Sequence, residues 1–192
     1  GIFAGGYTPT AQNNIQSIEI AHTGSGVDFG NLLAAAYGGA ATSSSVRGVI
    51  MAGYTSGTVN TVQYITISTT GNAVDFGDLT VARYYLTTNS NATRSIFGGG
   101  NTSNDTIDFF TTATTGNAQD FGNLATGTGT GGSASSPTRG LFAGGNSPTL
   151  QNRIEFITIS TTGNGTDFGD LTVDNDGKKH GIASFSNGHG GL

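Results

Sequence analysis

The feature that most constrains the fold of this chain is a short phrase that recurs four times. The copies read SGVDFGNLL, NAVDFGDLT, NAQDFGNLA and NGTDFGDLT, and their aspartates are Asp28, Asp75, Asp120 and Asp167. These aspartates lie 47, 45 and 47 residues apart in a chain of 192 residues. A period of this length is typical of repeat arrays, in which one unit cannot bury its apolar face alone. The spacing therefore predicts one domain of four units, over residues 1–46, 47–93, 94–138 and 139–192.

Two further phrases recur in step with the first. A glycine phrase reads GIFAGGYT, RGVIMAGYT, RSIFGGGNT and RGLFAGGNS, and an apolar phrase reads IQSIEIA, VQYITIS, IDFFTTA and IEFITIS. The apolar runs are rich in β-branched and aromatic residues and have the length of strands. Gly, Asn and Thr fill the turns between them, and no window shows the apolar spacing of a helix. Each unit is therefore expected to hold four short antiparallel strands: a before the arginine (as in 83–89), b the glycine phrase, c the apolar phrase and d the DFG phrase.

The order of these strands predicts how the array ends. The chain opens at a b phrase and finishes with an a-like phrase, GIASFSNG, at about residues 181–188. We expect this last strand to pair over 182–186 with residues 2–5 of the first unit, because unpaired strand edges invite aggregation. The a strands are rich in Gly and Ala, which suits the crowded axis of a narrow ring. The expected fold is thus an all-β, four-bladed β-propeller closed by its C-terminal strand. Since the chain opens at Gly1 without an initiating Met, we also expect it to be a processed product or the tail of a longer protein.

Composition argues against several classes of partner. The formal net charge of −5 disfavours nucleic acid and anionic membranes, both of which attract basic surfaces. No apolar stretch approaches 20 residues, so membrane insertion is not expected. The chain has no Cys, which removes thiol catalysis, disulfides and cysteine-bound zinc. No cofactor is expected.

The repeat resembles the kelch family of β-propellers. A kelch unit carries paired glycines after strand b, and these stand here at Gly5-Gly6, Gly99-Gly100 and Gly144-Gly145. It also carries aromatic residues in strands c and d, matched by Tyr64, Phe109, Phe156, Phe29, Phe76, Phe121 and Phe168. The chain departs from the family in two ways, because Phe replaces the usual Trp of strand d and Ala52-Gly53 replaces one glycine pair.

A closer resemblance is to the repeat regions of tail-fibre proteins of marine, cyanophage-type bacteriophages. The phrases TRGLFAGGN, YITISTTGNA, DFGDLTVAR and the terminal SNGHGGL carry this resemblance. It implies a virion protein that works outside the cell.

The recurring charged residues are interpreted as structural. One active site does not need four copies around a ring, so each DFG aspartate is expected to cap a turn or to pair with an arginine. Arg47, Arg94 and Arg139 each follow such an aspartate by 19 residues, and the adjacent phenylalanines are expected to pack between blades. The kinase DFG motif is a coincidence, because its glycine loop, lysine and catalytic loop are missing.

Enzymatic and metal sites find little support in the sequence. The three histidines, His22, His180 and His189, share no metal-ligand spacing, and no nucleophile stands with a base and an orienting group. The chain is therefore expected not to be an enzyme. Asp174 and Asp176, with Asp170 nearby, resemble half of a calcium loop, but the same letters are ordinary turn chemistry. A calcium ion at this stretch stays an open alternative.

Variation between the units points to the expected binding residues. The c–d loops hardly differ, whereas the b–c and d–a loops differ in every unit; both loop sets that vary fall on one face. Loops on a rigid scaffold commonly carry binding, although neutral drift gives the same pattern. The candidates on this face are Tyr7, Tyr54, Tyr84 and Tyr85, with the cationic run Lys178, Lys179 and His180.

These residues lead to one expected function and two alternatives. The first is a non-enzymatic phage tail-fibre or adhesin tip that binds a bacterial surface structure, either a glycan, which is the favoured partner, or a protein. The second is a structural virion module that binds another virion protein; a homo-oligomer formed within a larger fibre is an open alternative in either case. The third is a glycan-acting enzyme.

Overall fold

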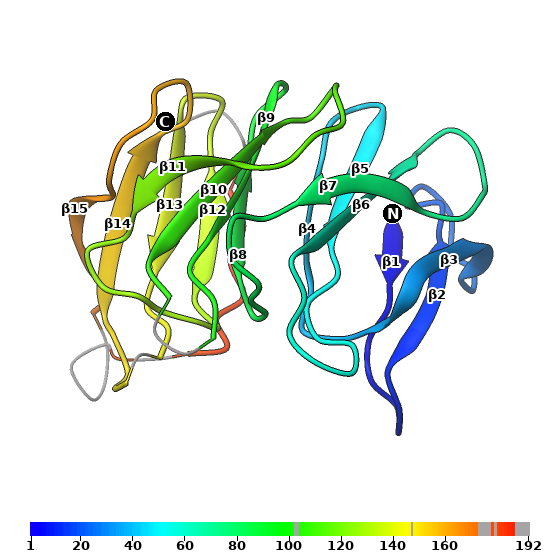
Figure 1. Cartoon of the computed structure of the whole chain (residues 1–192), viewed down its shortest axis with the longest axis horizontal. Helices are drawn as coiled ribbons and strands as arrows, with labels where there is room; N and C mark the ends of the chain where they lie inside the picture. Colours follow the sequence, from blue (N-terminus) through cyan, green and yellow to red (C-terminus); the bar gives the residue numbers. More distant parts are fainter. Residues whose placement is uncertain (102–103, 147, 173–177, 179, 187–192) are drawn as a thin grey trace.

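The computed structural model describes the chain except for residues 102–103, 147, 173–177, 179 and 187–192 (Figure 1). The described residues form fifteen strands in four antiparallel sheets, and they contain no helix. This part of the chain accordingly contains no helix that is long and apolar enough to cross a membrane.

The sheets follow one another along the chain as four meanders. The first contains β1 (Ile2–Ala4), β2 (Gln12–Ser17) and β3 (Val27–Ala36). The second contains β4 (Ala40–Ser43), β5 (Arg47–Met51), β6 (Thr61–Thr66) and β7 (Val74–Asp78). The third contains β8 (Thr87–Ser90), β9 (Arg94–Gly98), β10 (Thr106–Thr111) and β11 (Gln119–Asn123). The fourth contains β12 (Gly132–Ser135), β13 (Arg139–Ala143), β14 (Arg153–Thr158) and β15 (Thr166–Asp170).

The register repeats from sheet to sheet. The recurring arginine opens the b strands of the second, third and fourth sheets and faces a threonine of strand c: Arg47 faces Thr66, Arg94 faces Thr111 and Arg139 faces Thr158. Every c–d pair has an irregularity at the same place, for example between Val62 and Gln63. The repeat in the sequence is therefore a repeat in hydrogen bonding, including its β-bulge.

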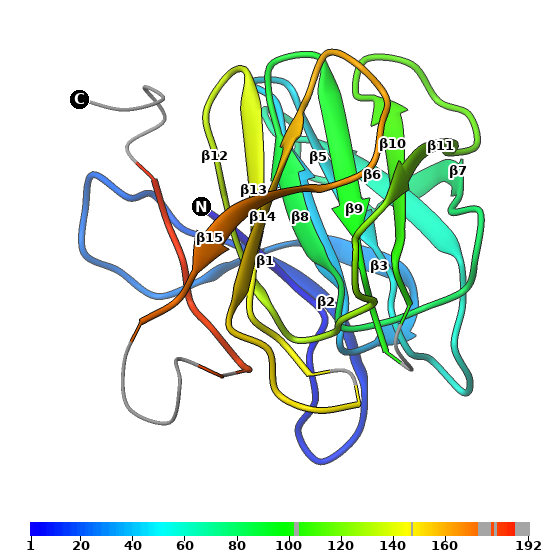
Figure 2. The ribbon, with the colours of Figure 1, turned by 90° about the vertical axis from the view of Figure 1, so that its left-hand side faces the viewer.

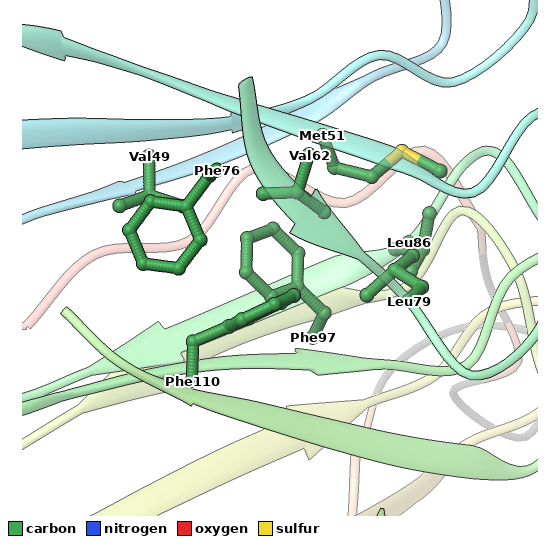
Figure 3. Packing of buried hydrophobic residues seen from close by; sticks show 8 residues of the cluster. All are labelled: Val49, Met51, Val62, Phe76, Leu79, Leu86, Phe97 and Phe110. Carbon is green, nitrogen blue, oxygen red and sulfur yellow. The ribbon is translucent and has the colours of Figure 1, made fainter. Parts of the chain in front are cut away.

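The apolar core consists of clusters between neighbouring sheets. Figure 3 shows the cluster between the second and third sheets, in which Phe76 of β7 lies edge-on to Phe110 of β10, with 5.3 Å between ring centroids. The cluster is completed by Val49, Met51, Val62, Leu79, Leu86 and Phe97. Similar clusters join the first sheet to the second, around Phe29, and the third to the fourth, around Phe121. Each sheet therefore depends on its neighbour to bury its apolar face.

The near-identical c–d turns also join the sheets. Backbone N–H groups of Gly71 and Ala73 donate to the carbonyl groups of Phe29 and Asn31 in the preceding sheet, each at 2.8 Å. The same bonds recur one unit later, where Gly116 donates to Phe76. These turns lie so close to the preceding d strand that a side chain would not fit there. At Gly77, which has φ of +144°, a Cβ would stand 2.3 Å from the carbonyl oxygen of Gly116.

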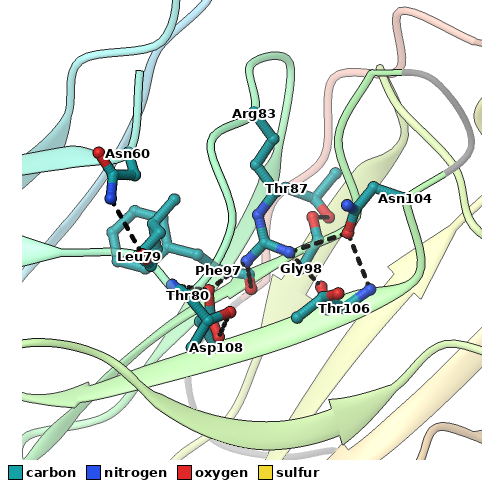
Figure 4. A network of polar contacts seen from close by, with 10 residues as sticks. All are labelled: Asn60, Leu79, Thr80, Arg83, Thr87, Phe97, Gly98, Asn104, Thr106 and Asp108. Carbon is teal, nitrogen blue, oxygen red and sulfur yellow. Dashed lines mark hydrogen bonds and ion pairs between the residues drawn. The ribbon is translucent and has the colours of Figure 1, made fainter. Parts of the chain in front are cut away.

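A buried polar side chain marks each of these junctions. Gln63, Asp108 and Glu155 occupy one repeat position, and each accepts a hydrogen bond from a backbone N–H of the preceding sheet, in β3 for Gln63 and in the link after the d strand for the other two. At Asp108 the contact includes an ion pair with Arg83, whose Nη2 lies 2.8 Å from the carboxylate (Figure 4). Burial raises the pKa of Asp108 and lowers that of Arg83, while their mutual attraction opposes both shifts.

Arg83 is thus a link residue that fastens the second sheet to the third. Its guanidinium also donates to the carbonyl group of Thr106 at 2.8 Å and to the side chain of Asn104 at 3.0 Å. The sequence predicted a strand from 83 to 89, whereas β8 begins at Thr87. Residues 83–86 are held in the link because Arg83 is buried between sheets.

The first and fourth sheets lie at opposite ends of the molecule (Figure 1). Substantial contacts join each sheet to the next through β3–β7, β4–β8 and β8–β12. The expected pairing of residues 182–186 with residues 2–5 is not made, because β1 belongs to a three-stranded sheet and pairs only with β2. The segment 181–186 lies instead beside the fourth sheet, where Ser184 and Ser186 bond to β12 (red in Figure 2).

Candidate functional site: a tyrosine cluster on the loop edge

Five of the six tyrosines form one continuous group of rings, which we call the tyrosine cluster. Its members are Tyr7, Tyr37, Tyr54, Tyr84 and Tyr85. The centroid distances along this order are 5.2, 5.3, 5.5 and 4.7 Å, with the ring planes tilted or edge-on. Such distances and tilts are favourable for aromatic pairs. The cluster comes from the b–c loops of the first two sheets and the d–a links that follow β3 and β7.

A repeated backbone bridge holds these rings in place. Tyr37 of the first link and Tyr54 of the next b–c loop exchange two backbone hydrogen bonds, of 3.0 and 2.9 Å. Tyr84 occupies the corresponding position one unit later, where its N–H bonds to the side chain of Asn101 at 2.9 Å. In the next unit the bridge joins Gly129 to Asn146. One scaffold position therefore carries tyrosine at one end of the array and Gly or Asn at the other.

Tyr85 adopts a backbone conformation that is uncommon for a bulky residue. Its φ is +58°, and its N–H donates to the carbonyl group of Gly38 at 2.8 Å. A non-glycine residue in this region carries a conformational cost of about 1–3 kcal/mol, and such residues concentrate at functional sites. The position repeats, because Gly38 and Thr130 also have positive φ. The fold thus holds the Tyr85 side chain at an exposed place that its own backbone preference would not favour.

The cluster offers solvent-exposed, uncharged aromatic surface. Tyr7 is 66% exposed and Tyr85 is 42% exposed, while the three rings between them are half-buried. Partial desolvation, followed by repulsion from neighbouring tyrosinates, raises the pKa of Tyr37 above 10. Its hydroxyl is therefore protonated at neutral pH and can both donate and accept hydrogen bonds. Flat rings with polar tips suit stacking and hydrogen bonding rather than proton transfer.

The predicted binding residues divide into two groups. Tyr7, Tyr54, Tyr84 and Tyr85 meet in the tyrosine cluster, and Tyr37, which the sequence did not single out, joins them. Lys178 and His180 are exposed on the link after β15 and take no part in the ring contacts of the cluster, and Lys179 lies outside the described residues. The signal that was missed at Tyr37 is its repeat position, which is the same as that of Tyr84.

Of the two roles expected for the DFG aspartates, pairing with an arginine does not occur in the described residues, whereas a local cap is seen at Asp167, whose Oδ1 accepts a hydrogen bond from the N–H of Gly169 at 3.3 Å. Asp28, Asp75, Asp120 and Asp167 are exposed, and the ion pairs of the described residues join other partners. The arginines lie over aromatic rings of strand c instead: Arg47 over Tyr64, Arg94 over Phe109 and Arg139 over Phe156, at 4.5–4.7 Å. Two of them also reach the following sheet, where Arg94 bonds to the carbonyl group of Ile159. The constant 19-residue spacing therefore reflects the repeat and not an Asp–Arg pair.

The described part of the chain contains no group of three or more His, Cys, Asp or Glu residues that could hold a metal ion. Asp170 is exposed at the end of β15, and the calcium candidates Asp174 and Asp176 lie outside the described residues.

Comparison of the chain with protein-family models found no match, and comparison with curated proteins found none either.

Proposed function

We propose that this chain is a non-enzymatic binding module that recognises a bacterial surface glycan through the tyrosine cluster. The observation that carries the proposal is the clustering itself, because five tyrosines from four separate loops converge on one edge. Rigid aromatic side chains with hydroxyl tips lose little entropy on binding and make large contacts. The resemblance to phage tail-fibre repeats supports a virion location and a bacterial surface as the ligand's source.

The architecture that we propose for this module is a kelch-like propeller with four blades per chain. Each sheet is a blade, and the segment 181–186 lies beside β12 in the position of an inner strand, which is the strand that the three-stranded first sheet lacks. A row of backbone hydrogen bonds supports this arrangement: Tyr85 donates to Gly38, Thr130 to Tyr85, and Gly181 to Thr130. All four residues have φ between +57° and +64°, as expected for equivalent positions around one axis.

The opposite edge of the sheets is the natural comparison surface. It carries the near-identical c–d turns, whose backbone groups are used in joining the sheets. Thr70 is an exposed residue of such a turn and provides a matched control for changes in the cluster. If the proposal is correct, changes at Tyr7 and Tyr85 affect binding, and a change at Thr70 does not.

The test is adsorption of the purified chain to host cells and to glycans released from them. Two stacking contacts of about 0.5–1.5 kcal/mol each correspond to roughly a tenfold weakening when both are lost. We therefore expect Tyr7→Ala/Tyr85→Ala to weaken glycan binding about tenfold, with Thr70→Ala unchanged. Loss of binding in the Thr70 variant alone would place the site on the other edge.

The structural virion module is the second candidate, and the apolar ends of the array favour it. Phe3 and Phe168 are largely exposed in the first and fourth sheets, which suits contact with another protein. Wild-type chain that adsorbs to no host glycan and yet binds purified virion proteins would support this candidate. The enzyme alternative would require turnover of the bound glycan, which the glycan assay measures directly.

A further inference from the structure

Neighbouring sheets of the array pack through the same kind of contact three times, and we call this contact a junction. At each end of the array, the side chains that would form one half of a further junction are exposed. In each junction a d-strand phenylalanine meets an apolar b-strand residue of the next sheet: Phe29 meets Ile50, Phe76 meets Phe97, and Phe121 meets Phe142. All six side chains are buried. The fourth d-strand phenylalanine, Phe168, is 54% exposed, and the remaining b-strand residue, Phe3, is 61% exposed. The two ends therefore carry the complementary halves of a fourth junction.

The backbone of the fourth sheet also lacks the covering turn that the other three sheets have. Gly30, Gly77 and Gly122 each lie against a c–d turn of the next sheet, close enough that a Cβ would stand 2.2–2.4 Å from a carbonyl oxygen. Gly169 occupies the same repeat position with φ of +138°, and no atom lies within 4 Å of a Cβ built there. The corresponding turn at the other end of the array is the exposed segment 22–26. Gly169 therefore has the conformation that makes room for a c–d turn, but no turn of the described residues lies against it.

The inner edges of the two ends also match. The hydroxyl groups of successive inner strands bond to the preceding strand in a fixed register, as Thr88 does to Ala41 at 3.0 Å and Ser135 to Ser90 at 3.2 Å. Ser186 bonds to Ser135 in the same register. The segment 181–186 therefore lies where the inner strand of a fifth sheet would lie. At the other end, a groove of about 760 Å³ runs between β1 and β4, lined by Ile2, Ala4, Ala41, Ser43 and Ser90.

We propose that these halves join head to tail between two copies of this chain. The segment 181–186 of one copy enters the groove beside β1 of the second copy, and Phe168 of the first packs against Phe3 of the second. The repeat fixes the register, because Gly132 faces Ala143 in the fourth sheet. Ala183 accordingly faces Ala4, and Phe185 faces Ile2. Strand addition of this kind supplies the backbone partners that β1 lacks on its open edge.

A second copy suits these surfaces better than the chain's own opposite end. The first and fourth sheets lie apart in the molecule, and bringing them together within one chain would require the three packed junctions to change (Figure 1). A contact between copies leaves all three junctions as they are. Such a contact is heterologous, so it produces a closed ring when the rotation allows and a fibre otherwise. Two chains of four sheets give eight sheets, which is within the usual range of about 4–8 blades in propellers.

The head-to-tail junction also unites the two groups of predicted binding residues. His180 has the repeat position of Tyr37, and Tyr7 has that of Tyr54, which is the bridge partner of Tyr37. The junction therefore places His180 of one copy beside Tyr7 of the other and extends the tyrosine cluster with a histidine. The junction rests on the proposed blade architecture and not on glycan binding, so the two proposals fail separately.

The first test measures molar mass by sedimentation and light scattering over a range of concentrations. We expect wild-type chain to form dimers or larger species, and Phe3→Asp and Phe168→Asp each to be monomeric, because each variant lacks one half of the junction. Mixed in equal amounts, the two variants retain one intact half each and are expected to form a 1:1 dimer. Val46→Asp changes an exposed apolar residue outside both ends and is expected to assemble like the wild type.

The second test identifies the partner by cysteine cross-linking, which is clean because the chain contains no native Cys. A mixture of Ala4→Cys chain with Ala183→Cys chain is expected to give a disulfide-linked dimer containing one of each. The double variant is expected to give linked dimers or longer species. A disulfide within one chain of the double variant, or a wild type that stays monomeric at every concentration, would overturn the proposal.

Discussion

Phe76 and Phe168 occupy the same position of the repeat, yet only Phe76 is covered by a following sheet. Phe76 is 2% exposed and contacts the ring of Phe110, whereas Phe168 is largely in solvent. We expect Phe76→Ala to lower the free energy of unfolding by about 3–5 kcal/mol, the usual cost of emptying a buried aromatic site. Phe168→Ala is expected to cost less than about 1 kcal/mol in the monomeric chain, as exposed substitutions do. Urea unfolding of both variants at low protein concentration measures the difference.

Equal losses in the two variants would contradict this account. A small loss at Phe76 would mean that the cluster around it repacks. A large loss at Phe168 would mean that the fourth sheet is already covered within a single chain.

Recurrence in the sequence decided which single residues could be predicted. The DFG phenylalanines recur four times, so packing between blades was predicted for all of them; the prediction is confirmed for Phe29, Phe76 and Phe121 and is wrong for Phe168, which no following sheet covers. Arg83 occurs once, and its partner Asp108 shares a repeat position with Gln63 and Glu155. Tyr37 lies in a run of small residues, and only the neighbouring sheet brings Tyr54 to it. Arg83 and Tyr37 each act through a partner from another unit and do not recur in every unit. The local sequence therefore contains no pattern from which their roles could be predicted.

At the scale of elements, the d strand and the following unit's c–d turn act as one structural feature. The turn donates two backbone hydrogen bonds to the d strand, and the strand's glycine leaves room for the turn's carbonyl group. This explains why the c–d turns are nearly identical while the b–c loops and d–a links vary. The sequence predicted the alternation of similar and varied loops, but not the turn's contact with the preceding sheet.

A comparison of Gly77 with Gly169 distinguishes the effect of the turn's packing from the effect of backbone strain. Both have strongly positive φ, so an alanine is strained at either position, but only Gly77 lies against a turn. We expect Gly77→Ala to be about 1–3 kcal/mol more destabilising than Gly169→Ala, the usual cost of overpacking. Denaturant midpoints of the two variants provide the measurement. Similar midpoints would show that backbone conformation, and not the close approach of the turn, accounts for the glycine in the DFG phrase.

At the scale of the whole molecule, the chain behaves as a linear array of four sheets. The sequence predicted the number of units and their strand order, because both follow from recurrence. It predicted closure by the chain's own last strand, from the need to hide strand edges, whereas the last segment lies on β12 and β1 keeps an open edge. An exposed strand edge such as that of β1 is normally covered, but this requirement does not determine whether the covering strand comes from the same chain or from a second copy.

An open array and a closed ring differ in how stability is distributed among the sheets. In a linear array the second and third sheets have two neighbours each, and the terminal sheets have one. Because stability in such arrays is approximately a sum of unit and neighbour terms, the terminal sheets open at lower free energy than the middle ones. In a closed ring every sheet has two neighbours and opens together with the others.

Amide hydrogen exchange measures this distribution directly. We expect the slowest exchange in β5, β6, β9 and β10, and the fastest in β1 and β15, when the chain is dilute and monomeric. The backbone groups on the open edge of β1 lack strand partners, so they are exposed to solvent until a strand covers them. As the concentration rises and copies join, protection of β1 and β15 should increase while that of β9 and β10 stays the same. Equal protection of all four sheets in the dilute monomer would instead identify a ring closed within one chain.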